Sequence, residues 1–152
     1  MNAWPHHSSL ELAALPNALY WARRYTEDVL AKWGADALLT HAKLVMNELV
    51  TNAVQHTGTL DDAAQRQYAE RPLSVPYSDL ARVGTVRLSL SYGGGRLLVE
   101  VWDESAEAPS EQLPDFGSES GRGLFIVSAY TERWGWYPEK GGGKVVWAEL
   151  AG

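Results

Sequence analysis

Three polar residues recur at every fourth position of a segment that is otherwise largely apolar, residues 48–56. On a helix, where each residue advances by about 100°, Glu48, Asn52 and His56 fall within about 80° of arc and form one polar stripe. An asparagine oxygen can bind a metal ion, and a glutamate can orient or deprotonate a nucleophile. Polar side chains on a helix that otherwise faces a core are costly to bury unless they bind something. The spacing therefore predicts either a binding site or, as the alternative, a capped or solvated helix edge.

A Gly-Arg-Gly sequence stands directly before a second apolar segment. Residues 121–127 read Gly-Arg-Gly-Leu-Phe-Ile-Val. Glycine lets backbone N–H groups approach an anion, and the N-terminus of a helix favours negative charge. The segment is neither a Walker phosphate loop nor the dinucleotide fingerprint, in which a third glycine would stand at the position of Ile126. Gly121 and Gly123 therefore fit either a phosphate contact or an ordinary loop that leads into a helix.

An aspartate closes a third segment, the run from Leu97 to Asp103. The β-branched and aromatic residues of this run predict a strand. At the end of a strand, Asp103 can accept a hydrogen bond from an amine or hydroxyl of a ligand, or it can simply begin a turn.

Taken together and in this order, the three segments resemble the GHKL-type ATP-binding fold shared by histidine kinases and gyrase B. Within that group, the chain is similar to stand-alone bacterial anti-sigma regulatory factors with serine/threonine kinase activity. The resemblance extends from about Leu10 to Leu150. It is carried by an N box over residues 48–56, a first glycine box at Asp103-Glu104-Ser105 and a second at Gly121-Arg122-Gly123-Leu124.

The resemblance implies a site for ATP and Mg2+. Asn52 would hold the Mg2+ ion through its side-chain oxygen, and Glu48 would act as the catalytic base for an incoming hydroxyl. Asp103 would bind the amino group of adenine. For His56 a structural bond to the adjoining loop is favoured over a phosphate contact. The other nucleotide contacts would come from the two glycine boxes, through Ser105, Gly121, Arg122, Gly123 and Leu124.

Two functions from different classes follow from this resemblance. The first is an ATP-dependent kinase that phosphorylates a serine of an antagonist protein and also sequesters a sigma factor; Glu48 favours it, because a pure binder needs no base. The second is a non-catalytic regulator that binds proteins through the same surface. It is favoured by Ser105, which stands where the family usually has glycine, and by an acidic lid over residues 110–120. A detached histidine kinase domain is a third alternative, and homodimer formation stays open.

The composition is typical of one cytoplasmic globular domain. The chain has 152 residues, of which 45% are hydrophobic, enough for a sizeable core. It has no cysteine, which excludes disulfides and thiolate metal sites, and its formal charge of −6 argues against direct nucleic-acid binding. No apolar run approaches the ~20 residues of a membrane span, and residues 1–9 lack the apolar core of a signal peptide. We therefore expect no membrane association.

The order of the predicted elements indicates a two-layer α/β sandwich, with a mixed, mostly antiparallel sheet and helices on one face, as in the histidine kinase-like ATPase fold. A flexible arm over residues 1–8 would precede a single domain over residues 9–152, with an inserted loop at about 59–84. The expected helices are 17–33, capped by Asn17, then 36–56 and 123–130. The expected strands are 9–15 and two hairpins, 85–92 with 96–102 and 132–137 with 144–150. The inner face of the first helix would carry Trp21, Tyr25, Val29 and Leu30.

Overall fold

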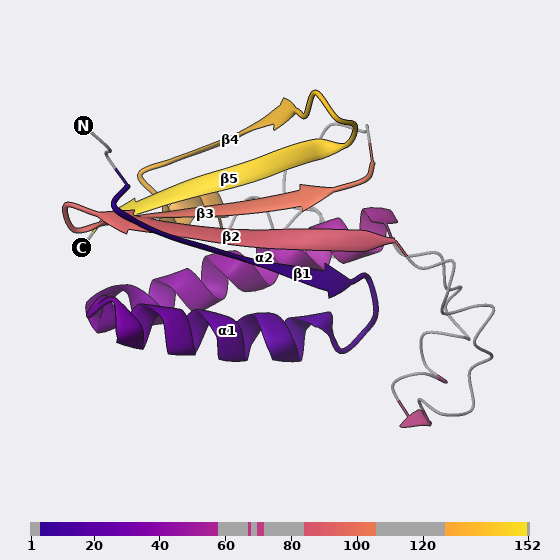
Figure 1. Cartoon of the computed structure of the whole chain (residues 1–152), viewed down its shortest axis with the longest axis horizontal. Helices are drawn as coiled ribbons and strands as arrows, with labels where there is room; N and C mark the ends of the chain where they lie inside the picture. The colour runs from indigo at the N-terminus through magenta and orange to yellow at the C-terminus, as the bar shows by residue number, and fades with distance from the viewer. Residues whose placement is uncertain (1–3, 58–66, 68–69, 72–83, 106–126, 152) are drawn as a thin grey trace.

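The computed structural model describes residues 4–57, 67, 70–71, 84–105 and 127–151. Within these residues a five-stranded sheet forms one layer, and two long helices lie along one face of it (Figure 1). The strands are β1 (His6–Ala13), β2 (Thr85–Gly93), β3 (Arg96–Asp103), β4 (Arg133–Pro138) and β5 (Lys144–Ala151). The helices are α1 (Ala18–Lys32), the short 3-10 helix η1 (Asp36–Leu38) and α2 (Leu39–Thr57). The predicted two-layer α/β sandwich is confirmed.

The sheet has the strand order β1-β2-β3-β5-β4, and each of its pairings is antiparallel. The largely antiparallel sheet is therefore as predicted, and parallel pairing is not found among the described strands. The central strand β3 pairs with its hairpin partner β2 on one side and with β5 on the other (Figure 1). In the β3–β5 register, Asp103 lies opposite Lys144 and Val101 lies opposite Val146. This register brings the end of β3 to the beginning of β5.

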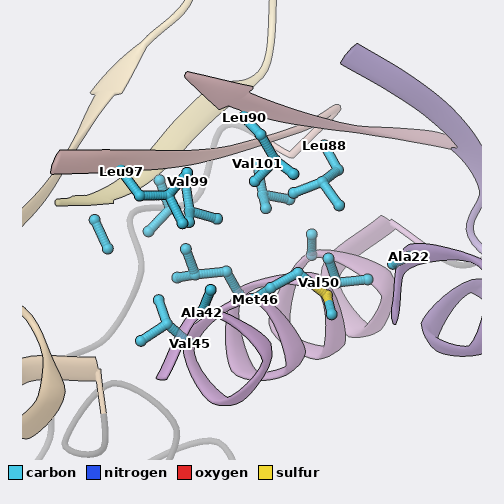
Figure 2. Close-up of a cluster of buried hydrophobic side chains, with 14 of the residues drawn as sticks. Ala22, Ala42, Val45, Met46, Val50, Leu88, Leu90, Leu97, Val99 and Val101 are labelled. Atoms are coloured by element: carbon cyan, nitrogen blue, oxygen red, sulfur yellow. The ribbon is translucent and has the colours of Figure 1, made fainter. Parts of the chain in front are cut away.

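The hydrophobic core fills the space between α2 and the sheet. Buried residues recur along α2 at intervals of three or four, which gives the helix one apolar face. Figure 2 shows Val45, Met46 and Val50 of α2 lying between the helix and a set of leucine and valine side chains on β2 and β3. Burial of each such side chain stabilises the fold by roughly 1.5–3 kcal/mol. This packing fixes α2 against the central strands.

Helix α1 presents mostly small residues to the core. Its buried positions are Ala18, Ala22, Thr26 and Leu30, each four residues from the next. The prediction that Trp21 faces inward is wrong, because the residue is 52% exposed. Of the other residues expected inside, Leu30 is buried, whereas Tyr25 and Val29 are only partly so.

The ends of the helices differ slightly from the prediction. Asn17 occupies the N-cap position of α1, but its side chain makes no capping hydrogen bond. The helix expected from Asp36 begins as η1 before it continues as α2, which ends at Thr57. None of the helices in the described part of the chain is long and apolar enough to cross a membrane.

Strand β1 begins earlier than expected, at His6, and ends at Ala13. The prediction placed the first eight residues in a flexible arm, yet His6 to Ser8 pair with β2. The His7 Nδ1 atom lies 2.8 Å from Ser91 Oγ, and the His6 ring stacks on Trp33 with 5.6 Å between centroids. These contacts with distant parts of the chain extend a strand that its own polar sequence does not predict.

Several predicted features fall largely on residues outside the described ranges. They include most of the inserted loop at 59–84, the acidic lid at 110–120 and the first residues of the helix expected over 123–130. Residues 127–130 are helical, as predicted, and Val127 is buried in the core.

Candidate functional site

The polar stripe predicted from the sequence lies on α2. Glu48, Asn52 and His56 all belong to this helix, at the four-residue spacing that places them on one side. Glu48 and Asn52 are half-buried and His56 is exposed, whereas Leu49 and Ala53 are buried on the core side. The predicted helical arrangement of the three residues is therefore confirmed, and their chemical roles stay predictions.

A buried ion pair joins the ends of two strands beside this helix. Asp103 is the last residue of β3 and Lys144 is the first residue of β5, and the two lie directly opposite each other. Lys144 Nζ donates to Asp103 Oδ1 at 2.9 Å, and the two side chains are 0% and 1% exposed. Directly opposed side chains in an antiparallel pair lie close together, so the register itself creates this contact.

The same carboxylate oxygen also orders the turn that follows β3. The backbone N–H of Ser105 donates to Asp103 Oδ1 at 2.8 Å. Two of the residues predicted for the first glycine box are therefore in contact through this hydrogen bond. An aspartate that bonds the backbone two residues later is a common turn former, so Asp103 begins a turn, as the alternative interpretation expected. Its role toward a ligand stays a prediction.

His56 connects the helix with the strand ends. Its Nδ1 atom lies 3.4 Å from Lys144 Nζ, and the lysine can donate to this nitrogen when the nitrogen carries no proton. The structure thus brings together Asp103 from β3, Lys144 from β5 and His56 from the last turn of α2. We call these three side chains the Asp103 cluster.

Two buried polar atoms near the ends of α2 and β3 have no hydrogen-bond partner among the described residues. They are Asp103 Oδ2 and Thr57 Oγ1. A buried polar atom without a partner costs about 1–3 kcal/mol, and more if it is charged. A donor from outside the described residues that bonded to Asp103 Oδ2 would therefore remove this cost.

The turn before β5 holds the Asp103 cluster in place. Gly143 has a φ of +79°, and a Cβ at this position would lie 2.1 Å from the backbone oxygen of Asp103. Trp102 Nε1 donates to the carbonyl oxygen of Gly142 at 3.0 Å, and the Arg87 guanidinium lies 5.3 Å from the centre of the Trp102 ring. Only a residue without a side chain allows the turn to approach β3 so closely.

The sequence prediction missed Lys144 as a site residue. The available signal was a lysine at an inward position of a strand whose next inward residues, Val146, Ala148 and Leu150, are apolar. Four other predicted site residues lie outside the described part of the chain, so their positions relative to the Asp103 cluster are not assigned. They are Gly121, Arg122, Gly123 and Leu124.

Comparison with known protein families agrees with this geometry. The model of the histidine kinase-like ATPase domain matches residues 12–150 of the chain. A search of the curated proteins gave no match. Domains of this kind typically bind ATP together with Mg2+. Since the match spans nearly the whole chain, the protein belongs to the histidine kinase-like ATPase domain family.

Proposed function

We propose that this protein is an ATP-binding regulator of the anti-sigma type, which phosphorylates a serine of an antagonist protein and sequesters a sigma factor. The observation that carries the nucleotide part is the buried Asp103 carboxylate, whose Oδ1 atom accepts two hydrogen bonds while Oδ2 has no partner among the described residues. The family match supports ATP binding. The cytoplasm, where sigma factors act, is the location that this function requires, and homodimer formation is compatible with it.

The free oxygen of Asp103 fits the adenine end of ATP. An ionised carboxylate presents only acceptors, and the exocyclic amino group of adenine is a donor. The Oδ1 atom already accepts hydrogen bonds from Lys144 and Ser105, so Oδ2 is the oxygen left for the base. The amino group would satisfy a buried acceptor that has no partner in the described part of the chain.

Asn52 fits the metal end. Mg2+ prefers oxygen ligands, keeps several waters and needs few protein ligands when phosphates are present. No group of three or more His, Asp or Glu side chains that could hold a metal occurs among the described residues, so a metal site here would depend on the phosphates. When bound, Mg2+ neutralises charge on the phosphates. Asn52 would hold it, with Gly121, Arg122 and Gly123 contacting the phosphates.

Glu48 would supply the base for phosphoryl transfer. It lies one helical turn before Asn52 on the same side of α2, which places a carboxylate next to the proposed metal ligand. Glu48 would accept the proton of the serine hydroxyl while the serine oxygen bonds to the γ-phosphorus. The bond between the γ-phosphorus and the β,γ-bridging oxygen breaks, and ADP leaves. The rest of the catalysis would consist of positioning the reactants and stabilising the charge of the transition state.

A non-catalytic regulator on the same fold is the second candidate. It is favoured by Ser105 in place of the usual glycine and by the acidic residues over 110–120. In this case the protein would hold its sigma factor or antagonist without transferring phosphate, and Glu48 would have no chemical role.

Single-turnover transfer from γ-labelled ATP to a candidate antagonist protein separates the two candidates. Glu48→Gln keeps the shape of the side chain but cannot accept the proton, so transfer should fall by about 100- to 10,000-fold. ATP affinity and capture of the sigma factor in a pull-down should change little. Glu11→Gln, an exposed site on β1, is the matched control and should transfer like the wild type. Equal transfer by Glu48→Gln contradicts the base; a wild type that binds ATP and partner without transfer favours the non-catalytic candidate.

A further inference from the structure

Lys144 carries a fully buried ammonium group on the side of the sheet that faces the core. Lysine is almost never fully buried unless it is paired, and a buried ion pair often stabilises a fold no more than apolar residues of similar size. The other inward residues of β5 are apolar, among them Val146 and Ala148. Stability alone therefore gives no reason for a lysine at this position, which points to a role in binding.

The hydrogen-bond capacity of Lys144 is not fully used by the described residues. An ammonium has three N–H donors. One reaches Asp103 Oδ1 at 2.9 Å, and a second can reach His56 Nδ1 at 3.4 Å. Among the described residues no partner takes the third donor.

Within the described part of the chain, the carboxylate of Asp103 has an unused acceptor, which complements the unused donor of Lys144. Its Oδ1 atom accepts from Lys144 Nζ and from the Ser105 N–H, whereas Oδ2 has no partner among the described residues. One donor and one acceptor thus remain on two side chains that are bonded to each other. A ligand that satisfies both must present an acceptor next to a donor.

We propose that Lys144 is a specificity-determining residue that donates to N1 of adenine while Asp103 Oδ2 accepts from the adjacent amino group. This inference rests on the proposed nucleotide site. Adenine carries the acceptor N1 beside the donor amino group on its pairing edge. Guanine carries the reverse pair, an N1–H donor beside a carbonyl oxygen. The Asp103–Lys144 pair therefore reads two atoms of the base, and His56 helps to position the ammonium.

The test compares ATP with 1-deaza-ATP, in which a C–H group replaces N1 and the amino group is kept. Isothermal titration in the presence of Mg2+ measures both affinities. A hydrogen bond from a charged donor is worth about 10- to 100-fold in affinity, so wild type should prefer ATP by this factor. Lys144→Met should bind both nucleotides equally. Lys140→Met, an exposed lysine in the turn before β5, is the matched control and should keep the wild-type preference.

A second variant keeps the test decisive if Lys144→Met does not fold. Lys144→Met leaves the Asp103 carboxylate buried without its counter-ion, so the double variant Asp103→Asn/Lys144→Met, which removes both charges, is measured beside it. The double variant should also bind the two nucleotides equally. Equal binding of ATP and 1-deaza-ATP by wild type, or an unchanged preference in the folded variants, overturns the role of Lys144 and leaves the proposed function standing. No binding of either nucleotide by wild type overturns both.

Discussion

Asp103 and Lys144 are 41 positions apart in the sequence, yet their side chains meet at 2.9 Å inside the protein. The contact exists because β3 and β5 are neighbours in the sheet and their register places the two residues directly opposite each other. It links the strand that carries the proposed adenine acceptor with the last strand of the domain. The stability of the fold and the proposed recognition of adenine would therefore both depend on the same pair.

The first prediction concerns the stability of this pair. Lys144→Met should lower the free energy of unfolding by about 3–5 kcal/mol, because it leaves a carboxylate buried without its counter-ion. Asp103→Asn/Lys144→Met should lose less than Lys144→Met alone, since neither charge remains. Urea unfolding of wild type, Lys144→Met, Asp103→Asn and the double variant measures the coupling energy between the two charges. Additive losses would show that the two charges do not depend on each other.

The second prediction concerns the turn before β5. Gly143→Ala should lower the free energy of unfolding by roughly 1–3 kcal/mol, because the added Cβ would meet the backbone of Asp103 and the φ of +79° disfavours a side chain. It should also weaken nucleotide binding by displacing Asp103 and Lys144. Gly141→Ala is the matched control, because a Cβ there meets nothing within 4 Å. Equal stability of the two variants in urea unfolding would contradict the close approach of this turn to β3.

The third prediction concerns acid stability. Burial would raise the pKa of Glu149, but hydrogen bonds and charge from Arg96 and Arg133 outweigh it and hold the pKa below the ordinary 4.5. Its side chain is only 6% exposed, and Arg96 Nη1 donates to Oε1 at 2.8 Å. A carboxylate whose pKa is lower in the folded state stabilises the fold above its unfolded pKa. That contribution is lost as the pH falls through the folded pKa.

Glu149→Gln should therefore destabilise the protein at pH 7 by about 1–3 kcal/mol, the loss of charge-assisted hydrogen bonds. The difference from wild type should shrink as the pH falls below about 4. Urea unfolding at several pH values measures it. A difference that stays constant down to pH 3 would show that the charge of Glu149 is not responsible.

The helical part of the site was predictable from the sequence. Glu48, Asn52 and His56 follow the helical period, and apolar residues such as Leu49 and Ala53 lie between them, so the local pattern defines both the helix and its polar side. Asp103 was predictable as the end of a strand, since the residues before it alternate and include β-branched and aromatic residues.

Lys144 and β1 were harder to predict because they depend on contacts between distant residues. The neighbour of β3 on its far side, β5, begins 41 residues after β3 ends, and no local pattern reveals the register that pairs Lys144 with Asp103. Strand β1 begins with polar residues such as His6 and His7, and its length comes from pairing with β2. Trp21 was placed wrongly because α1 packs through its small residues, such as Ala22, and leaves the aromatic ring exposed.

The binding of Mg-ATP is the central claim, and isothermal titration tests it most directly. Wild type should bind ATP with measurable heat in the presence of Mg2+ and much more weakly after EDTA is added. Asn52→Ala should weaken binding by at least about 10-fold, the loss typical even of outer-shell metal contacts. Gln55→Ala, an exposed position on the same helix, should bind like wild type. Absence of both heat and a thermal shift for wild type at millimolar Mg-ATP would contradict the account.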